Sequence, residues 1–317
     1  MNKICFGCGA KLQSENPNEE GYIPKEKLET STYCQRCFRI MHYGKNVEFN
    51  APKEVKSIVN NNNKNAKYVL FLTDLITLNE EIIKIFKSIK APKILVISKS
   101  DIIPKSIIFK NVINSLKSIY NIQDEIKIIS SKTGYGVNEL INYFYYKNIK
   151  EVYILGETNA GKSSLINKMM DYLDSNLNKV TTSNTSNTTL DFLRLKLSDN
   201  LTVIDSPGFV IGNNIQNNRL VNPKIYQMKK GETLKIDDYY FNFSNNTNIT
   251  IYFNKEVNAK KYYKEMALVN NISIKDDTDI IIKGEGFINI KSGCEIKTNI
   301  SKDNVELRRS IFGGTNE

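Results

Sequence analysis

Eight residues in the middle of the chain, GETNAGKS at 156–163, have the types and spacing that bind the phosphates of a nucleotide. Gly156 and Gly161 let backbone N–H groups close around a β-phosphate, and the helix that follows adds the positive end of its dipole. Lys162 supplies a positive charge to the phosphate oxygens, and the Ser163 hydroxyl is placed to ligate Mg²⁺. The pattern predicts a phosphate-binding loop, with further nucleotide contacts at Asn159, Ala160 and Ser164.

A second phosphate motif, DSPG at 205–208, ends a later apolar run. Asp205 can hold Mg²⁺ through water, and the backbone N–H of Gly208 can reach a γ-phosphate. The polar loop TTSNTSNTTLD at 181–191 lies between the two motifs, and one of its threonines should meet Mg²⁺ and the γ-phosphate. Thr189 is the predicted ligand, and spacing leaves Thr185 and Thr188 open as alternatives.

Two further polar stretches at strand ends are suited to reading a guanine base. In ILVISKSD at 94–101, Asp101 can accept hydrogen bonds from guanine N1–H and N2–H₂, and the stem of Lys99 can cover the ring. The next strand end predicts base contacts from Ser130, Ser131 and Lys132, with a backbone N–H directed toward guanine O6. Ser98 stands where the usual N-K-x-D motif has Asn, so an amide that normally braces the phosphate loop and the base is lost.

These motifs occur in an unusual order along the chain. The base-reading stretches come first, and the phosphate loop, the threonine loop and DSPG follow. This order predicts a circularly permuted GTPase domain, because the same parts can meet in space although their sequence order differs. The chain then leaves the DSPG segment directly into residues 221–317. A switch ordered by the γ-phosphate would therefore reposition that C-terminal region.

The elements that position these motifs alternate between short apolar runs and helical stretches. Apolar runs occupy 68–75, 93–101, 125–131, 151–156 and 201–208, and helical patterns include 79–90 and 161–173. Continuous apolar strands alternating with helices predict a mostly parallel sheet covered by helices on both faces, in the α/β class. The predicted domains are a four-cysteine zinc finger at 1–45, a permuted GTPase domain at 46–220 and a C-terminal domain at 221–317.

The C-terminal region has a different sequence pattern, in which most of the apolar stretches predict strands. NITIYF, DIIIKGEGFINI and NVELRRSIF predict strands, and turn residues separate them. EVNAKKYYKEMALVN at 256–270 predicts a polar helix between them. The expected fold of this region is strand-rich α+β.

Two C-x-x-C pairs near the N-terminus have the spacing of a metal site. Cys5, Cys8, Cys34 and Cys37 can form one tetrahedral Zn²⁺ site, although the 25 residues between the pairs exceed the usual zinc-ribbon range. Disulfides are the alternative, and the expected cytoplasmic location disfavours them. His42 is expected to pack or contact RNA, and Cys294 is expected to lie in a core.

Composition places the chain among globular proteins with a basic surface. The formal net charge is +10, and residues 51–150 hold 16 Lys against 8 acidic residues. This surplus indicates either a solvated lysine surface or a polyanionic partner such as RNA. No apolar run is long enough to span a bilayer, and no targeting segment is evident, so we expect a soluble cytoplasmic protein without a membrane partner.

The whole pattern resembles the YqeH family of ribosome-assembly GTPases. The residues that carry the resemblance are CQRCFRIMHY, GETNAGKSSLIN, TTLD, DSPG, NPKIYQMKKGETL and DIIIKGEGFINI with VELRRSIF. The resemblance implies slow hydrolysis of GTP to GDP, with Mg²⁺ and a structural zinc ion. It also implies an RNA- or protein-binding C-terminal domain at 221–317, and a nucleotide-gated switch acting on the small ribosomal subunit or its precursor. It leaves the oligomeric state open. Its predicted catalytic residues are Lys162, Asn159, Thr189 and Gly208.

The resemblance also bears on how hydrolysis is activated. The family replaces the catalytic Gln of other GTPases by an apolar residue, and Phe209 matches that position. Related GTPases with Asn in the phosphate loop use K⁺, so K⁺ activation at Asn159 is a hypothesis. Ser98 and Phe209 also support a different class of function, a nucleic-acid-binding zinc protein with a degenerate, structural nucleotide site. A third hypothesis, an organellar relative with a signalling role, has no targeting segment behind it.

Overall fold

The computed structural model describes residues 3, 5, 11–16, 21–28, 30–32, 34–35, 68–157, 160–174, 193–206, 222–264 and 268–312. Internal contacts divide the chain into two compact units. The first comprises Met1–Asp74, Phe86–Asp101 and Asp124–Val210, and the second comprises Leu75–Ile85, Ile102–Gln123 and Ile211–Glu317. The two units therefore interleave along the sequence.

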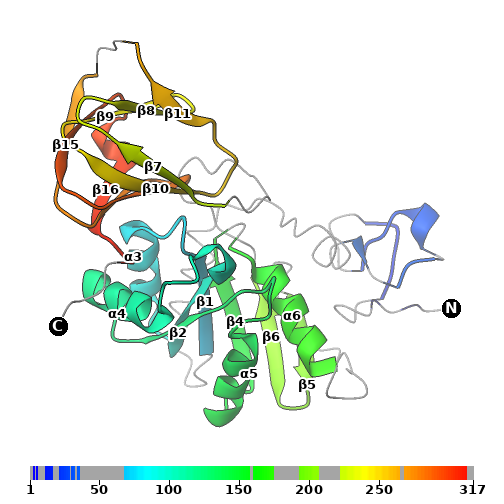
Figure 1. The fold of residues 1–317 in the computed structure, drawn as a ribbon. Coiled ribbons are helices and arrows are strands. Elements are labelled where there is room, and N and C mark those ends of the chain that lie inside the picture. Colours follow the sequence, from blue (N-terminus) through cyan, green and yellow to red (C-terminus); the bar gives the residue numbers. More distant parts are fainter. Residues whose placement is uncertain are drawn as a thin grey trace. The chain divides into compact units, whose positions relative to one another are not determined.

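The first unit is built on a six-stranded sheet in the order β3-β2-β1-β4-β6-β5 (Figure 1). Neighbouring strands pair in parallel except β5 and β6, which are antiparallel. The predicted mostly parallel sheet is therefore confirmed. Its strands are β1 (Tyr68–Asp74), β2 (Lys93–Ser98), β3 (Glu125–Ile128), β4 (Glu151–Gly156), β5 (Leu193–Ser198) and β6 (Leu201–Asp205).

The central strands are apolar along their length because both faces of the sheet are covered. Every residue of β1 after Tyr68 is buried. Leu70 and Leu72 pack in one cluster with residues of α5 (Val137–Tyr146) and α6 (Lys162–Asp174). Phe71 points to the other face, where its ring lies 5.7 Å from that of Phe86 near the end of α3 (Glu80–Ser88).

Two more helical segments follow strand ends. The 3₁₀ turn η2 (Ser100–Ile102) comes directly after β2, and α4 (Phe109–Tyr120) leads to β3. The helix α3 begins after Asn79, whose side-chain oxygen accepts the N–H of Ile82 at 3.0 Å as an N-cap. Short 3₁₀ turns also occur as η1 (Lys25–Lys27) and η3 (Lys302–Asn304).

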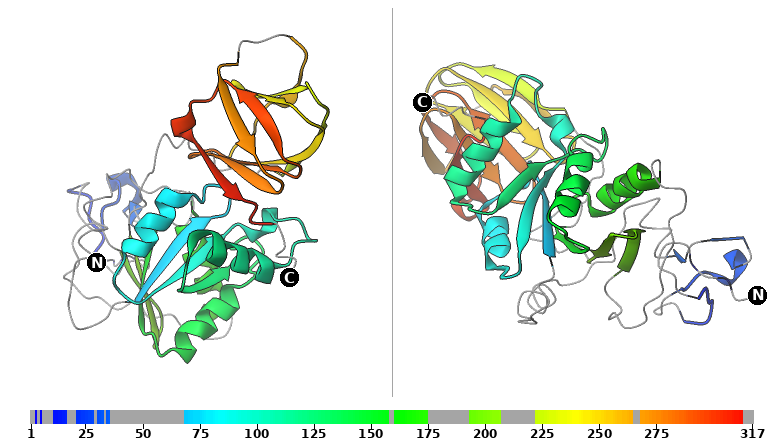
Figure 2. Two further views of the ribbon diagram at one scale, coloured as in Figure 1. Left: turned by 90° about the vertical axis from the view of Figure 1, so that its left-hand side faces the viewer. Right: turned by 90° about the horizontal axis from the view of Figure 1, so that it is seen from below.

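The C-terminal part of the second unit is a sandwich of two five-stranded sheets (Figure 2). The sheets have the orders β16-β13-β14-β10-β7 and β11-β8-β9-β15-β12, and their described pairings are antiparallel. Alternate residues point inward and form one core that includes Phe241, Phe243, Ile288 and Ile296. The strands are β7 (Lys224–Met228), β8 (Thr233–Ile236), β9 (Tyr239–Phe243), β10 (Thr247–Phe253), β11 (Ala259–Tyr262), β12 (Asn270–Ile274), β13 (Thr278–Ile282), β14 (Gly286–Ile290), β15 (Cys294–Thr298) and β16 (Val305–Arg309).

The predicted polar helix at 256–270 is wrong. Within this stretch Ala259–Tyr262 form β11, which pairs with β8, and β12 begins at Asn270. Lys, Glu, Ala and Met favour helices when isolated, but pairing with β8 decides the conformation of this segment. The described C-terminal part therefore contains strands and one 3₁₀ turn, and the expected α+β character is corrected to a β-sandwich.

The outward faces of the two sheets differ. We call the residues Asp279, Phe287, Asn289 and Arg308 of β13, β14 and β16 the closed face, because all four are buried. We call Lys235, Tyr240, Lys260, Tyr262 and Lys297 of β8, β9, β11 and β15 the open face, since each of these side chains is partly or fully exposed.

The described part of the N-terminal segment has little regular structure. Gln13 and Tyr22 form an isolated β-bridge, and the N–H of Leu12 donates to the carbonyl of Lys3 at 2.8 Å. Across all described residues, no helix combines the length and hydropathy needed to cross a membrane.

Candidate nucleotide site

The phosphate loop lies between the carboxyl end of β4 and the first turn of α6. Gly156 ends β4, and a Cβ there would lie 2.1 Å from the carbonyl oxygen of Leu72, so only glycine allows β4 to pair so closely with β1. Gly161 has φ of +96°, a conformation that glycine adopts without strain. The strand, loop and helix context that the motif predicts is therefore present.

Lys162 is folded back onto its own loop. Its ammonium donates to the carbonyl oxygens of Gly156 and Glu157, both at 2.8 Å, and the residue is 3% exposed. Burial lowers the pKa of Lys162 to about 8, although the charges of Asp205 and Glu157 act in the opposite direction. A buried ammonium held by neutral carbonyls gains strongly when phosphate oxygens replace them.

The predicted magnesium residues of the described part lie at neighbouring strand ends. Asp205 ends β6 and pairs in register with Ile154 of β4, two residues before the loop begins. Asp205 is 3% exposed and Ser163, in the first turn of α6, is 6% exposed. A buried carboxylate at the end of β6 and a buried serine hydroxyl in the first turn of α6 are oxygen donors of the kind that Mg²⁺ prefers, so these residues fit that ion. Ser164 is exposed on the outer side of the same turn.

The base-reading residues form a second polar group at the ends of β2 and β3. Ser130 donates its hydroxyl to Asp101 at 2.7 Å, and the ammonium of Lys132 lies 3.9 Å from the other carboxylate oxygen. These contacts fix the orientation of the Asp101 carboxylate. The Ser131 hydroxyl is buried and has no hydrogen-bond partner in the described part of the chain, so the segment retains an unused polar atom.

Ser98 makes a contact with the phosphate loop that the sequence analysis assigned to the missing asparagine. Its hydroxyl donates to the carbonyl oxygen of Ala160 in the phosphate loop at 2.6 Å, and the residue is 3% exposed. The expected loss of a brace between the base-reading strand and the phosphate loop is therefore corrected. A hydroxyl forms that bridge in place of an amide.

Three residues that sequence reasoning missed join the two halves of the site. Thr73 donates its hydroxyl to Glu157 of the phosphate loop at 3.0 Å, and Asp74 accepts the ammonium of Lys99 at 2.6 Å. Thr73 and Asp74 are consecutive at the end of β1, between β2 and β4. The available signal was that β1, like the functional strands, ends in polar residues.

Lys99 itself has a strained backbone. Its φ is +61°, in the left-handed region that non-glycine residues rarely adopt. Strain of this kind persists where surrounding contacts hold a residue for a functional reason. Here the ion pair with Asp74 holds the side chain that is expected to cover the base.

The comparisons with known proteins agree with this geometry. Residues 59–213 match the model of the RsgA GTPase family. The protein YqeH of Bacillus subtilis is 30% identical over 230 residues, which cover 70% of this chain and 62% of that protein. Residues 59–213 are therefore similar to the RsgA GTPase family.

Other relatives are matched over smaller parts of their own length. GTPase Der of Karelsulcia muelleri is 31% identical over 163 residues, covering 47% of this chain and 36% of that protein. Nitric oxide-associated protein 1 of Mus musculus is 25% identical over 255 residues, covering 61% of this chain and 36% of that protein. The chain thus spans less than two thirds of these relatives. The similarity to the RsgA GTPase family and to a GTPase relative supports GTP hydrolysis.

Several residues of the predicted nucleotide site lie outside the described residues. These are Asn159 of the phosphate loop, the switch threonines Thr185, Thr188 and Thr189, and Gly208 and Phe209 of the DSPG segment. Cys8, Cys37 and His42 of the N-terminal segment also lie outside them.

Two of the four predicted zinc ligands are described and lie together. Cys5 and Cys34 are both buried, and the backbone N–H of Cys34 donates to the sulfur of Cys5 at 3.1 Å. Among the described residues no group of three or more His, Cys, Asp or Glu could hold a metal ion. Cys294 lies in the sandwich core, as expected.

Proposed function

We propose that the chain is a guanine-nucleotide switch that hydrolyses GTP slowly and acts in the cytoplasm on the small ribosomal subunit or its precursor. The observation behind this proposal is the pairing of a phosphate loop with an oriented carboxylate, Asp101, across the bridge from Ser98 to Ala160. Phosphate binding alone suits any nucleotide, whereas the carboxylate at the end of β2 is suited to guanine. The resemblance to the YqeH family supports the ribosomal part.

The described residues divide the work of hydrolysis. Lys162 leaves the carbonyls of Gly156 and Glu157 to neutralise charge on the β- and γ-phosphate oxygens. Ser163 and Asp205 would hold Mg²⁺, which would supply positive charge to offset the charge that develops on the phosphates. Water attacks the γ-phosphorus while the bond to the β–γ bridging oxygen breaks, giving GDP and phosphate. Asn159, Thr189 and Gly208 complete the proposed catalytic set.

Slow turnover is proposed because Phe209 cannot orient the attacking water through a hydrogen bond. A partner, or K⁺ at Asn159, would supply the missing stabilisation. The check is turnover at equal ionic strength in KCl and NaCl. Equal rates would rule out the K⁺ proposal and leave the partner as activator.

Guanine specificity has a direct test at Asp101. Asparagine in its place offers an amide N–H₂ to the base, which suits the C2 carbonyl of xanthine and not the N2 amine of guanine. Asp101→Asn should therefore lose GDP binding and gain XDP binding. A matched change at Asp124, a partly exposed residue just before β3 whose carboxylate lies 4.0 Å from the ammonium of Lys93, should leave both affinities unchanged. Unchanged GDP affinity in Asp101→Asn would contradict the proposed base site.

The N-terminal segment is proposed to be a zinc finger with ligands Cys5, Cys8, Cys34 and Cys37. Its support is the contact between the first cysteine of each C-x-x-C pair, since backbone N–H donors orient thiolates that bind a metal. The proposed domain organisation keeps the zinc finger at 1–45, the GTPase domain at 46–220 and the C-terminal domain at 221–317. Metal analysis of purified protein should find one zinc per chain, and Cys34→Ser should release it.

The open face of the sandwich is the proposed contact for single-stranded RNA. Tyr240 and Tyr262 have ring centroids 5.1 Å apart, and the ammonium of Lys235 lies 5.1 Å from the Tyr240 centroid. Lys260 and Lys297 are exposed on the same face. Tyrosine rings stack on bases and lysines contact phosphates, which is how sheets bind single strands. Tyr240→Ala should weaken binding of an RNA oligonucleotide by about tenfold, whereas the exposed control Tyr263→Ala should not.

The decisive experiment is co-sedimentation with ribosomal subunits in the presence of a non-hydrolysable GTP analogue, GDP or an ATP analogue. Small-subunit binding with the GTP analogue alone, retained at moderate salt, is the expected result. Binding that ignores the nucleotide and disappears with salt would favour the alternative, a nucleic-acid-binding zinc protein with a structural nucleotide site. The lysine surplus at 51–150 would then explain the binding.

A further inference from the structure

A buried arginine in the last strand has no part in the nucleotide chemistry described above. The Arg308 side chain is 2% exposed, and its Nε donates to Asp279, whose side chain is 0% exposed, at 3.0 Å. Asp279 also accepts from the side chain of Asn289 at 2.7 Å and from the backbone N–H of Ile311 at 3.2 Å. The carboxylate is therefore satisfied within the sandwich, and the arginine keeps donors for other partners.

Those donors point away from the sandwich, to two segments that lie earlier in the sequence. Nη1 of Arg308 donates to the carbonyl oxygen of Leu78 at 2.8 Å and to the Tyr120 hydroxyl at 3.2 Å. Glu306 accepts the N–H of Glu80 with its two carboxylate oxygens, at 3.1 and 3.0 Å. A carboxylate at the N-terminus of α3 is favourable because it meets the positive end of the helix dipole. One strand thus holds the start of α3 and the end of α4.

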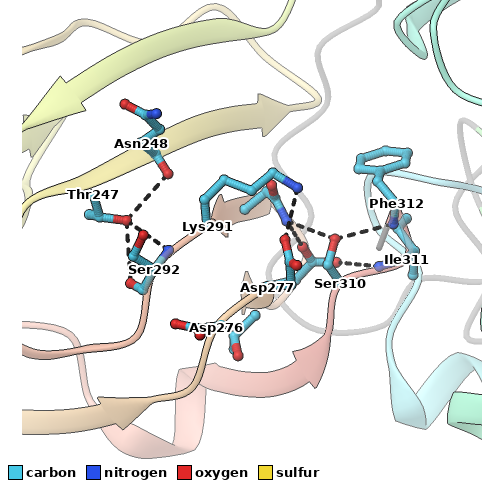
Figure 3. A network of polar contacts seen from close by, with 12 residues as sticks. Thr247, Asn248, Asp276, Asp277, Lys291, Ser292, Ser310, Ile311 and Phe312 are labelled. Carbon is cyan, nitrogen blue, oxygen red and sulfur yellow. Dashed lines mark hydrogen bonds and ion pairs between the residues drawn. The ribbon is translucent and has the colours of Figure 1, made fainter. Parts of the chain in front are cut away.

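The strand that makes these contacts is itself fixed. Beyond β16 the N–H of Ser310 donates to the carbonyl of Asp277 at 2.6 Å, and the Ser310 hydroxyl accepts the N–H of Phe312 at 3.1 Å (Figure 3). Lys291 pairs with Asp277 at 2.9 Å in the same network. Arg308 therefore cannot move without the rest of the sandwich.

The segments held by Arg308 are those that follow the base-reading residues. The first unit ends one stretch at Asp74 and another at Asp101, and the second unit begins with the next residue in each case. Asp74 accepts a hydrogen bond from Lys99, and Leu78 lies four residues after Asp74 in the sequence. Asp101 is in η2, and the chain continues from there through α4 to Tyr120. Both carboxylates of the base half of the site are thus covalently joined to segments anchored on the sandwich.

We propose that Arg308 and Glu306 are positioning residues for guanine recognition, because they hold the two segments that place Asp74 and Asp101. This inference rests on the proposed guanine site. The sandwich is also connected to the nucleotide site by the chain itself, through residues 207–221, which follow the γ-phosphate motif. The proposed contacts of Arg308 and Glu306 are a second connection, and they act on the base-reading residues. By thermodynamic linkage, a partner that shifts the sandwich changes guanine affinity, and a bound base changes affinity for that partner equally.

The test compares guanine selectivity in variants that weaken the contacts of Arg308 and Glu306. Arg308→Met removes all its contacts, while Tyr120→Phe and Glu306→Gln each weaken one contact and bury no unpaired charge. The matched control is Arg309→Met, at the exposed neighbouring position. GDP and ADP dissociation constants are measured well below the unfolding temperature of each variant, together with KM and kcat for GTP.

Loosening the contacts of Arg308 and Glu306 should weaken binding of the guanine base and leave binding of the phosphates unchanged. Arg308→Met should weaken GDP binding by about fivefold or more, and the two milder variants by about two- to threefold. ADP binding should stay constant, KM for GTP should rise and kcat should hold, since base contacts are equal in ground and transition states. A purely structural role would lower thermal stability and leave the GDP to ADP ratio unchanged.

Three results would overturn the inference. One is a ratio of GDP to ADP affinity that stays at the wild-type value in every folded variant. Another is a loss of GDP affinity in Arg309→Met as large as that in Arg308→Met. If Arg308→Met does not fold, Tyr120→Phe and Glu306→Gln decide the question. The third is a wild-type protein that does not prefer GDP to ADP, which overturns the proposed guanine site as well and is visible before any variant is made.

Discussion

Two buried cations, one in each unit, have nearly equal exposure and opposite electrostatic situations. Lys162 is 3% exposed and Arg308 is 5% exposed. The ammonium of Lys162 donates to two neutral carbonyls, and burial lowers its pKa to about 8. Burial alone would also lower the pKa of Arg308, but Tyr120 and Asp279 outweigh it and raise the pKa.

The difference separates a binding residue from an anchoring residue. Arg308 pairs with a buried carboxylate and donates Nη1 to Leu78 and Tyr120, so its desolvation is compensated in large part within the protein, although its Nη2 is buried with no hydrogen-bond partner among the described residues. Lys162 has two neutral carbonyls as its hydrogen-bond acceptors, and the charges of Asp205 and Glu157 offset its desolvation only in part, so its charge is further compensated when an anion arrives. A cation with a depressed pKa at the carboxyl ends of parallel strands therefore indicates a ligand site, whereas a buried cation with a raised pKa indicates structure.

The largest expected effect is on stability at Arg308. Arg308→Met leaves the Asp279 carboxylate buried without its cation and should lower the free energy of unfolding by about 3 to 5 kcal/mol. Arg309→Met, on the exposed side of the same strand, should change it by less than about 0.5 kcal/mol. Urea unfolding at neutral pH measures both. Equal values for the two variants would remove the anchoring half of the comparison.

Lys162→Met should give the opposite pattern. Nucleotide affinity should fall by about 2 to 3 kcal/mol, since charge-assisted bonds to phosphate are lost. Stability should change little or rise, because the variant no longer buries a partly desolvated charge. Calorimetric titration with GDP measures the affinity, and urea unfolding measures the stability. Lys168→Met, at a partly exposed position of the same helix, is the control. A loss of stability as large as that of Arg308→Met would break the distinction between the two cations.

The depressed pKa of Lys162 also predicts a pH dependence of binding. Below pH 8 the lysine is charged with or without nucleotide, so affinity should be flat. Above pH 8 the free protein loses this proton, while bound phosphate retains it, so affinity should fall toward tenfold per pH unit. The contribution of this lysine to folding has the opposite sign: stability rises as pH passes 8, since the unfolded lysine still holds its proton.

The control for this pH profile is Lys162→Met. Its weaker affinity should show only the titration of the guanine base itself, which the wild-type protein shares. The difference between the two profiles from pH 7 to 9 isolates the lysine. Parallel profiles would contradict a pKa near 8.

The sequence could predict the parts of the fold that local residue spacing determines. Gly156, Gly161 and Lys162 predict the phosphate loop because each position has one physical requirement, and continuous apolar runs predict the parallel strands. The stretch at 256–270 failed because its helix-favouring composition is overridden by pairing of β11 with β8. Contacts between residues far apart in the sequence could not be predicted either, because they also depend on tertiary structure. Thr73 meets Glu157 and Arg308 meets Leu78 only once distant segments have folded together.

The smallest expected effect tests whether the two halves of the nucleotide site are joined by one hydroxyl. Ser98→Ala removes the donor to the Ala160 carbonyl, which then lies buried beside a methyl group. The net value of one neutral hydrogen bond is about 1 kcal/mol, so GDP affinity should fall by about fivefold. Ser98→Asn restores a donor and should recover part of that loss. Ser100→Ala, at a buried serine two residues later, is the matched control. If Ser98→Ala binds GDP like the wild type, the Ser98 hydroxyl does not join the halves, and Thr73 and Asp74 at the end of β1 remain their connection.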